Sequence, residues 1–273
     1  MSQYSRIKVI ASLAIILFFS ACQPDQPDEE QNLTPVETLD TLYIATSSNM
    51  QYVVQVLTQI FNLDYNVPIQ VKVGSSTDLD TQITKDTLFD FLFTTDQAFL
   101  DSLFQNGFSP SPPEDIAYGK LVLWTLESGY MPDMVALRSP SIKTVGLPDP
   151  KSTAYGATIL SILEKEEMMD FLGPRLVYQK NLIETNQLIT SGEVSIGFTA
   201  KSLVLSPQYT EVGSWIEVDD RLYDPIPHQF LRLHKLGEPH PLATTFEEFI
   251  KSQRVKDVLA NFGFLPNGLL GNH

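Results

Sequence analysis

Small hydroxyl and amide residues gather at three points of the chain where a strand-like apolar segment gives way to a helix-like one. These clusters are Thr46-Ser47-Ser48-Asn49, Gly74-Ser75-Ser76-Thr77 and Ser152-Thr153-Ala154-Tyr155-Gly156. A helix begins with N–H groups that have no partner inside the helix, and it carries the positive end of its dipole there. Hydroxyl and amide side chains add further donors, so each cluster could bind an anion.

The same residues also have a purely structural interpretation. Serine, threonine and asparagine are the usual N-cap residues of helices, whatever the protein does. A single cluster of this kind therefore favours capping alone. Three clusters in one chain leave capping and anion binding both open as interpretations.

Residue patterns typical of enzymes are missing from the sequence. We find no Gly-x-Ser-x-Gly, no phosphate-binding Gly-x-x-x-x-Gly-Lys-Ser/Thr, no Gly-x-Gly-x-x-Gly and no His-Glu-x-x-His. The histidines lack the close spacing of zinc ligands, and we interpret them as surface or structural residues: His228, His234, His240 and His273. Asp149 is the carboxylate nearest to a cluster, but an aspartate just after a strand is typical of a turn. We therefore expect no catalysis, no metal and no cofactor.

The N-terminus has the pattern of an export signal. Arg6 and Lys8 precede an uncharged run, 9–19, which is too short for a permanent membrane helix of about 20 residues. The run leads into Ser20-Ala21-Cys22, which resembles the bacterial lipobox. We therefore expect residues 1–21 to be a signal peptide and Cys22 to carry a lipid, although a buried cysteine is the alternative. Since Cys22 is the only cysteine, an internal disulfide is excluded.

Residues 22–38 after the lipid site are polar and acidic and predict a disordered tether. The whole chain carries a formal net charge of −15. Such a charge repels nucleic acid and anionic membrane surfaces, so neither is expected as a direct partner of the folded part. We expect the folded part to begin near Leu39.

The periodicity of apolar residues predicts the strands and helices that position the three clusters. Alternating strand and helix patterns predict an α/β fold with largely parallel sheets. Strands are predicted at 41–46, 69–73, 89–93, 121–126, 144–147 and 194–198, and helices at 50–61, 79–83, 98–105, 155–165, 182–190 and in two segments of 246–262. Strands near Leu121 and His228 where the chain crosses predict two lobes, one of residues 39–120 with 228–272 and one of residues 121–227. A ligand would lie in the cleft between them, near the carboxyl ends of strands.

The order of these motifs resembles the periplasmic molybdate-binding proteins of ABC transporters, which have the type II solute-binding fold. The resemblance runs from about Leu42 to Pro266. It rests on these segments in order: Ala45–Met50; Gly74–Thr77 with Gln82-Ile83; Asp90–Asp96; Asp149-Pro150 with Ala154-Tyr155-Gly156; Asn181-Leu182; Ser191-Gly192-Glu193; Gly197–Ala200; Tyr223, Pro225, Ile226 and Gln229; and Gly263-Phe264.

The resemblance implies a set of ligand contacts in this chain. Ser48, Asn49 and Ser76, with the neighbouring Ser75, would donate to an oxyanion from side chains and backbone, and the side chains of Asn49 and Ser76 would face the cleft. Tyr155 and Leu182 would donate through backbone N–H groups. Ala200 stands where some members have a ligand-binding tyrosine, and Ala154 replaces the usual proline. Members bind a dianion with neutral donors only, so an acidic chain is compatible with an anionic ligand.

The sequence thus predicts a monomeric, lipid-anchored, extracytoplasmic protein that captures molybdate or tungstate for an ABC importer. Three alternatives stay open. One is a binding protein for sulfate, phosphate or a small carboxylate. The others are surface lipoproteins of the same fold with an enzymatic or an assembly role.

Overall fold

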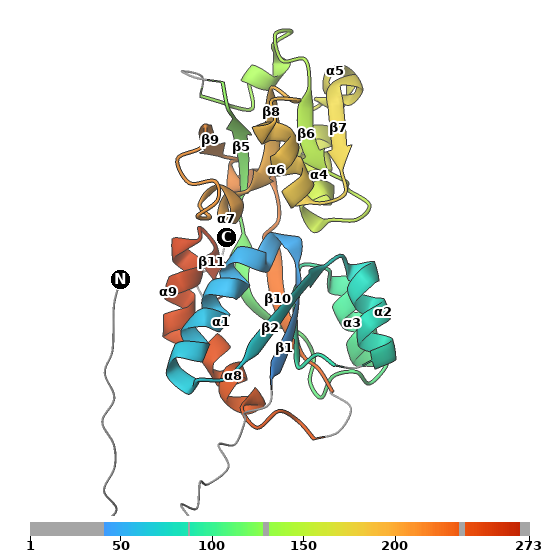
Figure 1. Ribbon diagram of the computed structural model, residues 1–273. Coiled ribbons are helices and arrows are strands. Elements are labelled where there is room, and N and C mark those ends of the chain that lie inside the picture. The colour runs from blue at the N-terminus through green and yellow to red at the C-terminus, as the bar shows by residue number, and fades with distance from the viewer. Residues whose placement is uncertain (1–40, 87, 128–130, 235–237, 268–273) are drawn as a thin grey trace, which may run out of the picture. The chain divides into compact units, whose positions relative to one another are not determined.

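The computed structural model describes residues 41–86, 88–127, 131–234 and 238–267 (Figure 1). The predicted signal peptide, Cys22 and the tether lie outside the described residues. None of the described helices is long and apolar enough to span a membrane. All described residues belong to one unit of the chain, 39–273, which contains two separate β-sheets.

The first sheet combines strands from both ends of the folded part. Its order is β11-β4-β10-β3-β1-β2, and β1 pairs in parallel with β2 and β3, whereas β10 and β11 pair antiparallel. The strands are β1 (Leu42–Ser47), β2 (Ile69–Gly74), β3 (Phe91–Thr94), β4 (Glu114–Gly119), β10 (Ile226–Arg232) and β11 (Leu265–Pro266).

Helices cover both faces of this sheet (Figure 1). On one face lie α1 (Gln51–Tyr65), α8 (Ala243–Ile250) and α9 (Gln253–Asn261), whose apolar stripes pack with Ile44, Phe91 and Phe230. On the other face lie α2 (Ser76–Asp86) and α3 (Gln97–Gln105), which pack with Ala45 and Leu92. Successive residues of a strand point to opposite faces, so the apolar runs of β1 and β3 supply both layers of core.

The second sheet has the order β7-β6-β8-β5-β9. Here β6 pairs in parallel with β7 and β8, and β5 pairs antiparallel with β8 and β9. The strands are β5 (Leu121–Thr125), β6 (Val145–Pro148), β7 (Leu176–Gln179), β8 (Ile196–Ala200) and β9 (Ser214–Glu217). Its helices are α4 (Ala154–Lys165), α5 (Met169–Leu172), α6 (Leu182–Thr190) and α7 (Lys201–Val204). Short 3-10 turns are η1 (Ser48–Met50), which directly follows β1 of the first sheet, and η2 (Ala136–Arg138), η3 (Gly173–Arg175) and η4 (Asp220–Leu222).

The chain passes between the two sheets where β4 leads into β5 and again where β9 leads into β10. Gly119 and Ile226 are register partners at this passage. A Cβ atom at Gly119 would overlap the Tyr155 hydroxyl and the His228 ring. Glycine is therefore required here by the close approach of two buried side chains rather than by a turn.

Most predicted elements are present, and the α/β class is confirmed. The sheets are more mixed than the largely parallel arrangement predicted from the sequence. Among the described strands, the pairings of β4, β5, β9, β10 and β11 are antiparallel. Of these, β4, β9 and β11 were not predicted, because their short and partly exposed segments carry no clear strand period.

Candidate functional site

The first two clusters lie side by side at the end of the first sheet. β1 and β2 are parallel neighbours, and their last residues, Ser47 and Gly74, are register partners. The turn η1 begins directly after Ser47, and α2 begins at Ser76. Two helical starts therefore lie side by side at the same end of the sheet, as expected for the carboxyl ends of parallel strands.

The third cluster has a neighbour of the same kind in the second sheet. β6 and β7 are parallel, and Pro148 is the register partner of Gln179. The loops that follow are tied together, because the Asp149 N–H donates to the Gln179 carbonyl at 2.7 Å. After these loops α4 begins at Ala154 and α6 at Leu182. Leu182, whose role as a ligand contact only the family resemblance indicated, is thus a fourth helix start of the same geometry.

Contacts join the two pairs of helix starts. The turn η1 of the first pair lies against α6 of the second pair. In β10, the His228 Nε2 atom lies 3.3 Å from the Asn49 amide nitrogen and 3.4 Å from the Tyr155 hydroxyl. The structure therefore brings together Ser48, Asn49, Tyr155 and Leu182, which are distant in the sequence, through contacts between their elements.

The caps of α4 and α6 leave the first N–H groups of both helices available. The Thr153 hydroxyl accepts from the Gly156 N–H at 2.9 Å, and the Asn181 side chain accepts from the Glu184 N–H at 2.9 Å. The N–H groups of Tyr155 and Leu182 precede these capped groups and have no acceptor within their helices. Both residues are buried, 1 % and 2 % exposed. Leucine has no side-chain donor, and the Tyr155 hydroxyl is directed at His228, so the backbone N–H groups are the donors that these positions would offer to a ligand.

The side chain of Asn49 has a different orientation from the predicted one. It is only 7 % exposed, and its oxygen accepts from the Ser47 hydroxyl at 2.5 Å. Its nitrogen points to the Thr95 hydroxyl at 3.4 Å and to His228. Asn49 was expected to face the cleft as a side-chain donor, but in this structure its amide is engaged inside the protein. Ser48, beside it, is half-buried.

Ser75 and Ser76 differ in their local roles. The Ser75 hydroxyl donates to the Asp78 carboxylate at 2.7 Å and accepts from the Asp78 N–H at 3.2 Å. These two hydrogen bonds cap the N-terminus of α2, and one of them uses the hydroxyl proton of Ser75. Ser76 is the first residue of α2 and is half-buried. The capping interpretation therefore accounts for Ser75, Thr153 and Asn181, whereas it does not involve the hydroxyl of Ser76.

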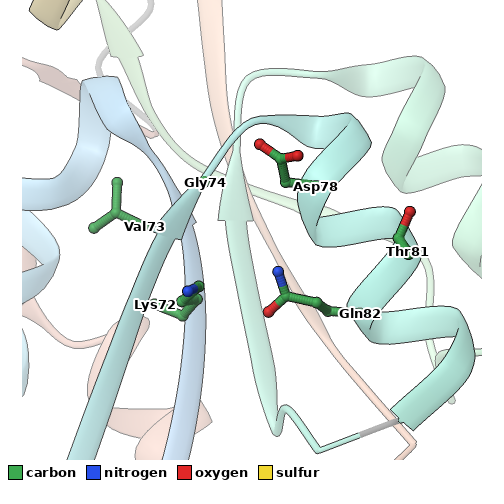
Figure 2. Close-up of a pocket in the computed structure, with 6 residues that line it drawn as sticks. All are labelled: Lys72, Val73, Gly74, Asp78, Thr81 and Gln82. Atoms are coloured by element: carbon green, nitrogen blue, oxygen red, sulfur yellow. The ribbon is translucent and has the colours of Figure 1, made fainter.

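A hollow of about 340 Å³ lies beside the Ser75 cap (Figure 2). Figure 2 shows Asp78 and Gln82 on the side of α2 nearer to the edge strand β2, where Lys72 lies opposite Gln82. Thr81 of α2 also belongs to the lining. Its lining contains Gly74 but not Ser48, Tyr155 or Leu182. Because exposed Lys72 and Asp78 form its walls, we do not assign this hollow as the ligand site.

His228 was interpreted from the sequence as a surface or structural residue, and no role at this site was predicted for it. It is fully buried, and burial lowers its pKa to about 4, although the nearby Ile226 carbonyl opposes that shift. Its interpretation as a structural histidine is compatible with this position. Its contacts with Asn49 and Tyr155 were not predicted. The available signal was its place at the predicted crossing between the lobes.

The neighbouring tyrosines are neutral. Burial, with a smaller contribution from Tyr223, raises the pKa of Tyr155 far above its usual range. Burial also raises the pKa of Tyr223, whose hydroxyl accepts from the Leu121 N–H at 3.2 Å. No group of three or more histidine, cysteine, aspartate or glutamate side chains suited to a metal ion occurs in the part of the chain that the structure describes. The converging groups are therefore neutral hydrogen-bonding groups.

Residues 42–265 match the family described as bacterial extracellular solute-binding proteins. The chain belongs to this family. Its members are solute-binding proteins and work outside the cytoplasm, so the extracytoplasmic location expected from the sequence is confirmed at that level. The relatives found are binding proteins rather than enzymes.

Individual relatives agree with this assignment. The molybdate-binding protein ModA of Rhodobacter capsulatus is 28% identical over 194 residues, 70% of this chain and 75% of that protein. A Bacillus subtilis protein, YvgL, named as a substrate-binding lipoprotein of an ABC transporter, is 22% identical over 257 residues, 93% of this chain and 96% of that protein.

The solved structure of the periplasmic molybdate-binding protein of Azotobacter vinelandii has the same fold. The TM-score is 0.74 at 21% identity, and the match covers 82% of this chain and 98% of that chain. The predicted two-lobed periplasmic-binding-protein fold is thereby confirmed.

Proposed function

We propose that this protein captures molybdate, tungstate or a similar tetrahedral oxyanion for an ABC importer. The observation that carries the proposal is that helix starts from two sheets are linked: η1 contacts α6, and His228 contacts both Asn49 and Tyr155. The start of α2 lies beside η1 at the same end of the first sheet. Each start offers N–H groups and the positive end of a helix dipole, which favour an anion. The molybdate-binding relatives from Rhodobacter and Azotobacter support the choice of ligand.

The proposed contacts divide into two kinds. Ser48 and Ser76 donate through hydroxyl or backbone groups, and Tyr155 and Leu182 donate through backbone N–H groups. We assign Asn49 and Ser75 mainly to holding their loops in place, since Asn49 is bonded to Ser47 and Ser75 to Asp78. In this assignment both residues remain at the ligand site, but their side chains act through their neighbours.

Neutral donors are sufficient for a dianion in a site without water. Hydrogen bonds to an ionised oxygen are roughly twice as strong as neutral ones, and a low local dielectric strengthens them further. The net charge of −15 therefore does not oppose the proposal. Sulfate would be disfavoured by its smaller size. Hydrogen phosphate would be disfavoured because none of the proposed contacts is a carboxylate that accepts its proton.

The remaining features of the proposal concern the whole chain. Residues 1–21 are removed, Cys22 carries the lipid, and residues 22–38 tether the folded part. The similarity to a substrate-binding lipoprotein of Bacillus subtilis supports the anchor. The lobes are 39–120 with 228–272 and 121–227, and the protein works as a monomer that delivers its ligand to a permease. No enzymatic activity is part of this proposal.

Thermal unfolding with a panel of oxyanions tests the proposed function. A ligand that binds only the folded state stabilises it by mass action, by about 2.7 kcal/mol at 100 times its dissociation constant. We expect molybdate and tungstate to raise the melting temperature well above the shift produced by equal sulfate or phosphate. An equal or larger shift with sulfate or phosphate would contradict the choice of ligand.

A further inference from the structure

The ring of His228 is fixed from several sides. It is fully buried, and it meets the ring of Phe264 edge-on, with ring centroids 4.8 Å apart and planes 72° apart. The Tyr155 ring lies on another side at 5.8 Å and 76°. Gly119 leaves space for the ring, since a Cβ atom there would collide with it. The histidine therefore has one orientation in this packing.

The hydrogen bonds of the ring decide which nitrogen carries the proton. The Nδ1 atom lies 3.2 Å from the Ile226 carbonyl oxygen, which can only accept, so Nδ1 must be the donor. A neutral imidazole then has an acceptor at Nε2. The lowered pKa of this buried ring supports the neutral form at neutral pH.

Two donors approach this single acceptor from different parts of the molecule. The Asn49 amide nitrogen reaches Nε2 at 3.3 Å, and the oxygen of the same amide accepts from Ser47, which is consistent with the nitrogen as donor. The Tyr155 hydroxyl reaches Nε2 at 3.4 Å. Asn49 follows β1 of the first sheet, whereas Tyr155 lies in the first turn of α4, over the second sheet.

We propose that His228 is a positioning residue of the ligand site, whose Nε2 atom holds the Asn49 loop and the start of α4 in register. The inference rests on the proposed function, because it assigns these two segments to the ligand. His228 itself does not touch the ligand in this proposal. It fixes the separation between the donors of Ser48 and the N–H of Tyr155.

Two substitutions separate positioning from simple core packing. His228→Phe keeps an aromatic ring of similar size but removes the acceptor. His228→Gln places a carbonyl oxygen near the former Nε2 position and restores an acceptor. We expect His228→Phe to weaken molybdate binding about five- to ten-fold by calorimetric titration, the equivalent of one ordinary hydrogen bond. His228→Gln should remain within about two-fold of the wild type.

The matched control is His240, which is also buried. It lies before α8, and its Nδ1 accepts from the Leu242 N–H at 3.1 Å. His240→Phe should lower stability without changing the dissociation constant for molybdate. If His228→Phe and His228→Gln change affinity equally, or if neither changes it, His228 serves packing alone and the inference is wrong.

A measurement without ligand tests the inference separately from the proposed function. Its first part uses the wild type alone, so it does not depend on the folding of a variant. Nitrogen NMR of the wild-type imidazole should show the proton of His228 on Nδ1. The side-chain amide signals of Asn49 should move in His228→Phe and stay in place in His228→Gln. A proton on Nε2, or an unmoved Asn49 amide in His228→Phe, would overturn the inference. If the wild type instead binds no oxyanion, only the proposed function fails.

Discussion

Ser75 and Asp78 exchange two hydrogen bonds at the start of α2. The Ser75 hydroxyl donates to the Asp78 carboxylate at 2.7 Å, and the Asp78 N–H donates back to that hydroxyl at 3.2 Å. The neighbouring Ser76 takes no part in this exchange. Two adjacent serines with the same chemistry are thus assigned different roles, capping for Ser75 and ligand binding for Ser76.

Ser76→Ala should weaken molybdate binding about ten- to a hundred-fold. A hydrogen bond to a charged group contributes roughly 1.5–3 kcal/mol, and about 1.4 kcal/mol corresponds to a factor of ten. Calorimetric titration measures this loss. The folding stability should change little, because Ser75 rather than Ser76 caps the helix.

Ser75→Ala is the matched control for that prediction. Losing an N-cap hydroxyl costs roughly 0.5–2 kcal/mol of folding stability, which a urea melt detects. The affinity for molybdate should change less than in Ser76→Ala. The reverse pattern, with affinity lost in Ser75→Ala alone, would mean that the two roles have been exchanged.

Tyr155→Phe should leave molybdate affinity within about three-fold of the wild type. Its proposed donor is the backbone N–H, which the substitution keeps, and Asn49 retains the His228 acceptor in the absence of the hydroxyl. The hydroxyl contact at 3.4 Å is long for a hydrogen bond, so its loss should be small. Titration of this variant beside His228→Phe measures the difference. A larger loss in Tyr155→Phe, with none in His228→Phe, would assign the hydroxyl itself to the ligand.

The free energy of unfolding should decrease as the pH falls below about 6.5, the usual pKa of histidine. The unfolded chain then binds a proton at residue 228, whereas burial holds the pKa of folded His228 at about 4. Stability that is present above pH 6.5 is therefore lost on acidification, by about 2 kcal/mol at about pH 5. Tyr155 is the titratable side chain that contacts the ring, and it stays neutral over this range.

Urea melts of the wild type and of His228→Gln across this pH range measure the effect. Glutamine does not titrate, so the variant should lose less stability on acidification than the wild type. Carboxylates such as Glu217 and Glu247, whose pKa values are lowered by nearby lysines or arginine, contribute equally in both proteins. Identical pH dependence in the two proteins would exclude His228 as its source.

The sequence predicted the elements whose residues are buried throughout. β3 and β5, for example, have every residue buried, and their apolar runs are plain in the sequence. β7 and β9 are the two edge strands of the second sheet, and all of their residues are half-buried or exposed. An edge strand needs no continuous apolar run, so such strands carry little signal in a single sequence.

The sequence predicted the helix starts of the candidate site but not the contacts between their side chains. Residues at helix starts are visible in a sequence because capping and anion binding both favour serine, threonine and asparagine. The choice between Ser75 and Ser76, however, depends on the side chain of Asp78. The link between Asn49 and His228 joins residues 179 positions apart, and no local pattern reports such a contact.

Cys22→Ser should leave the protein unanchored or its precursor uncleaved. The expectation rests on the uncharged run that leads into Cys22 and on the need for a thiol to carry the lipid. Fractionation of cells that express the two forms, with mass spectrometry of the mature N-terminus, measures the outcome. A wild-type protein that is soluble and begins at Met1 would contradict both the anchor and the cleavage.

Leu182→Pro tests a backbone donor directly, which a side-chain substitution cannot do. Leu182 is the first residue of α6, where proline is well tolerated because the missing N–H has no partner within the helix. The preceding Asn181 is extended, with φ −155° and ψ 173°, as a residue before proline should be. The helix should therefore form normally in this variant.

Leu182→Ala is the comparison, since it shortens the same buried side chain but keeps the N–H. Both variants should lose stability from the smaller side chain, because Leu182 is 2 % exposed. Only Leu182→Pro should lose molybdate affinity, by about ten- to a hundred-fold for one hydrogen bond to an anion. Circular dichroism confirms that α6 and its surroundings remain folded, and titration gives the two dissociation constants. Equal affinities in the two variants would remove the Leu182 N–H from the ligand site.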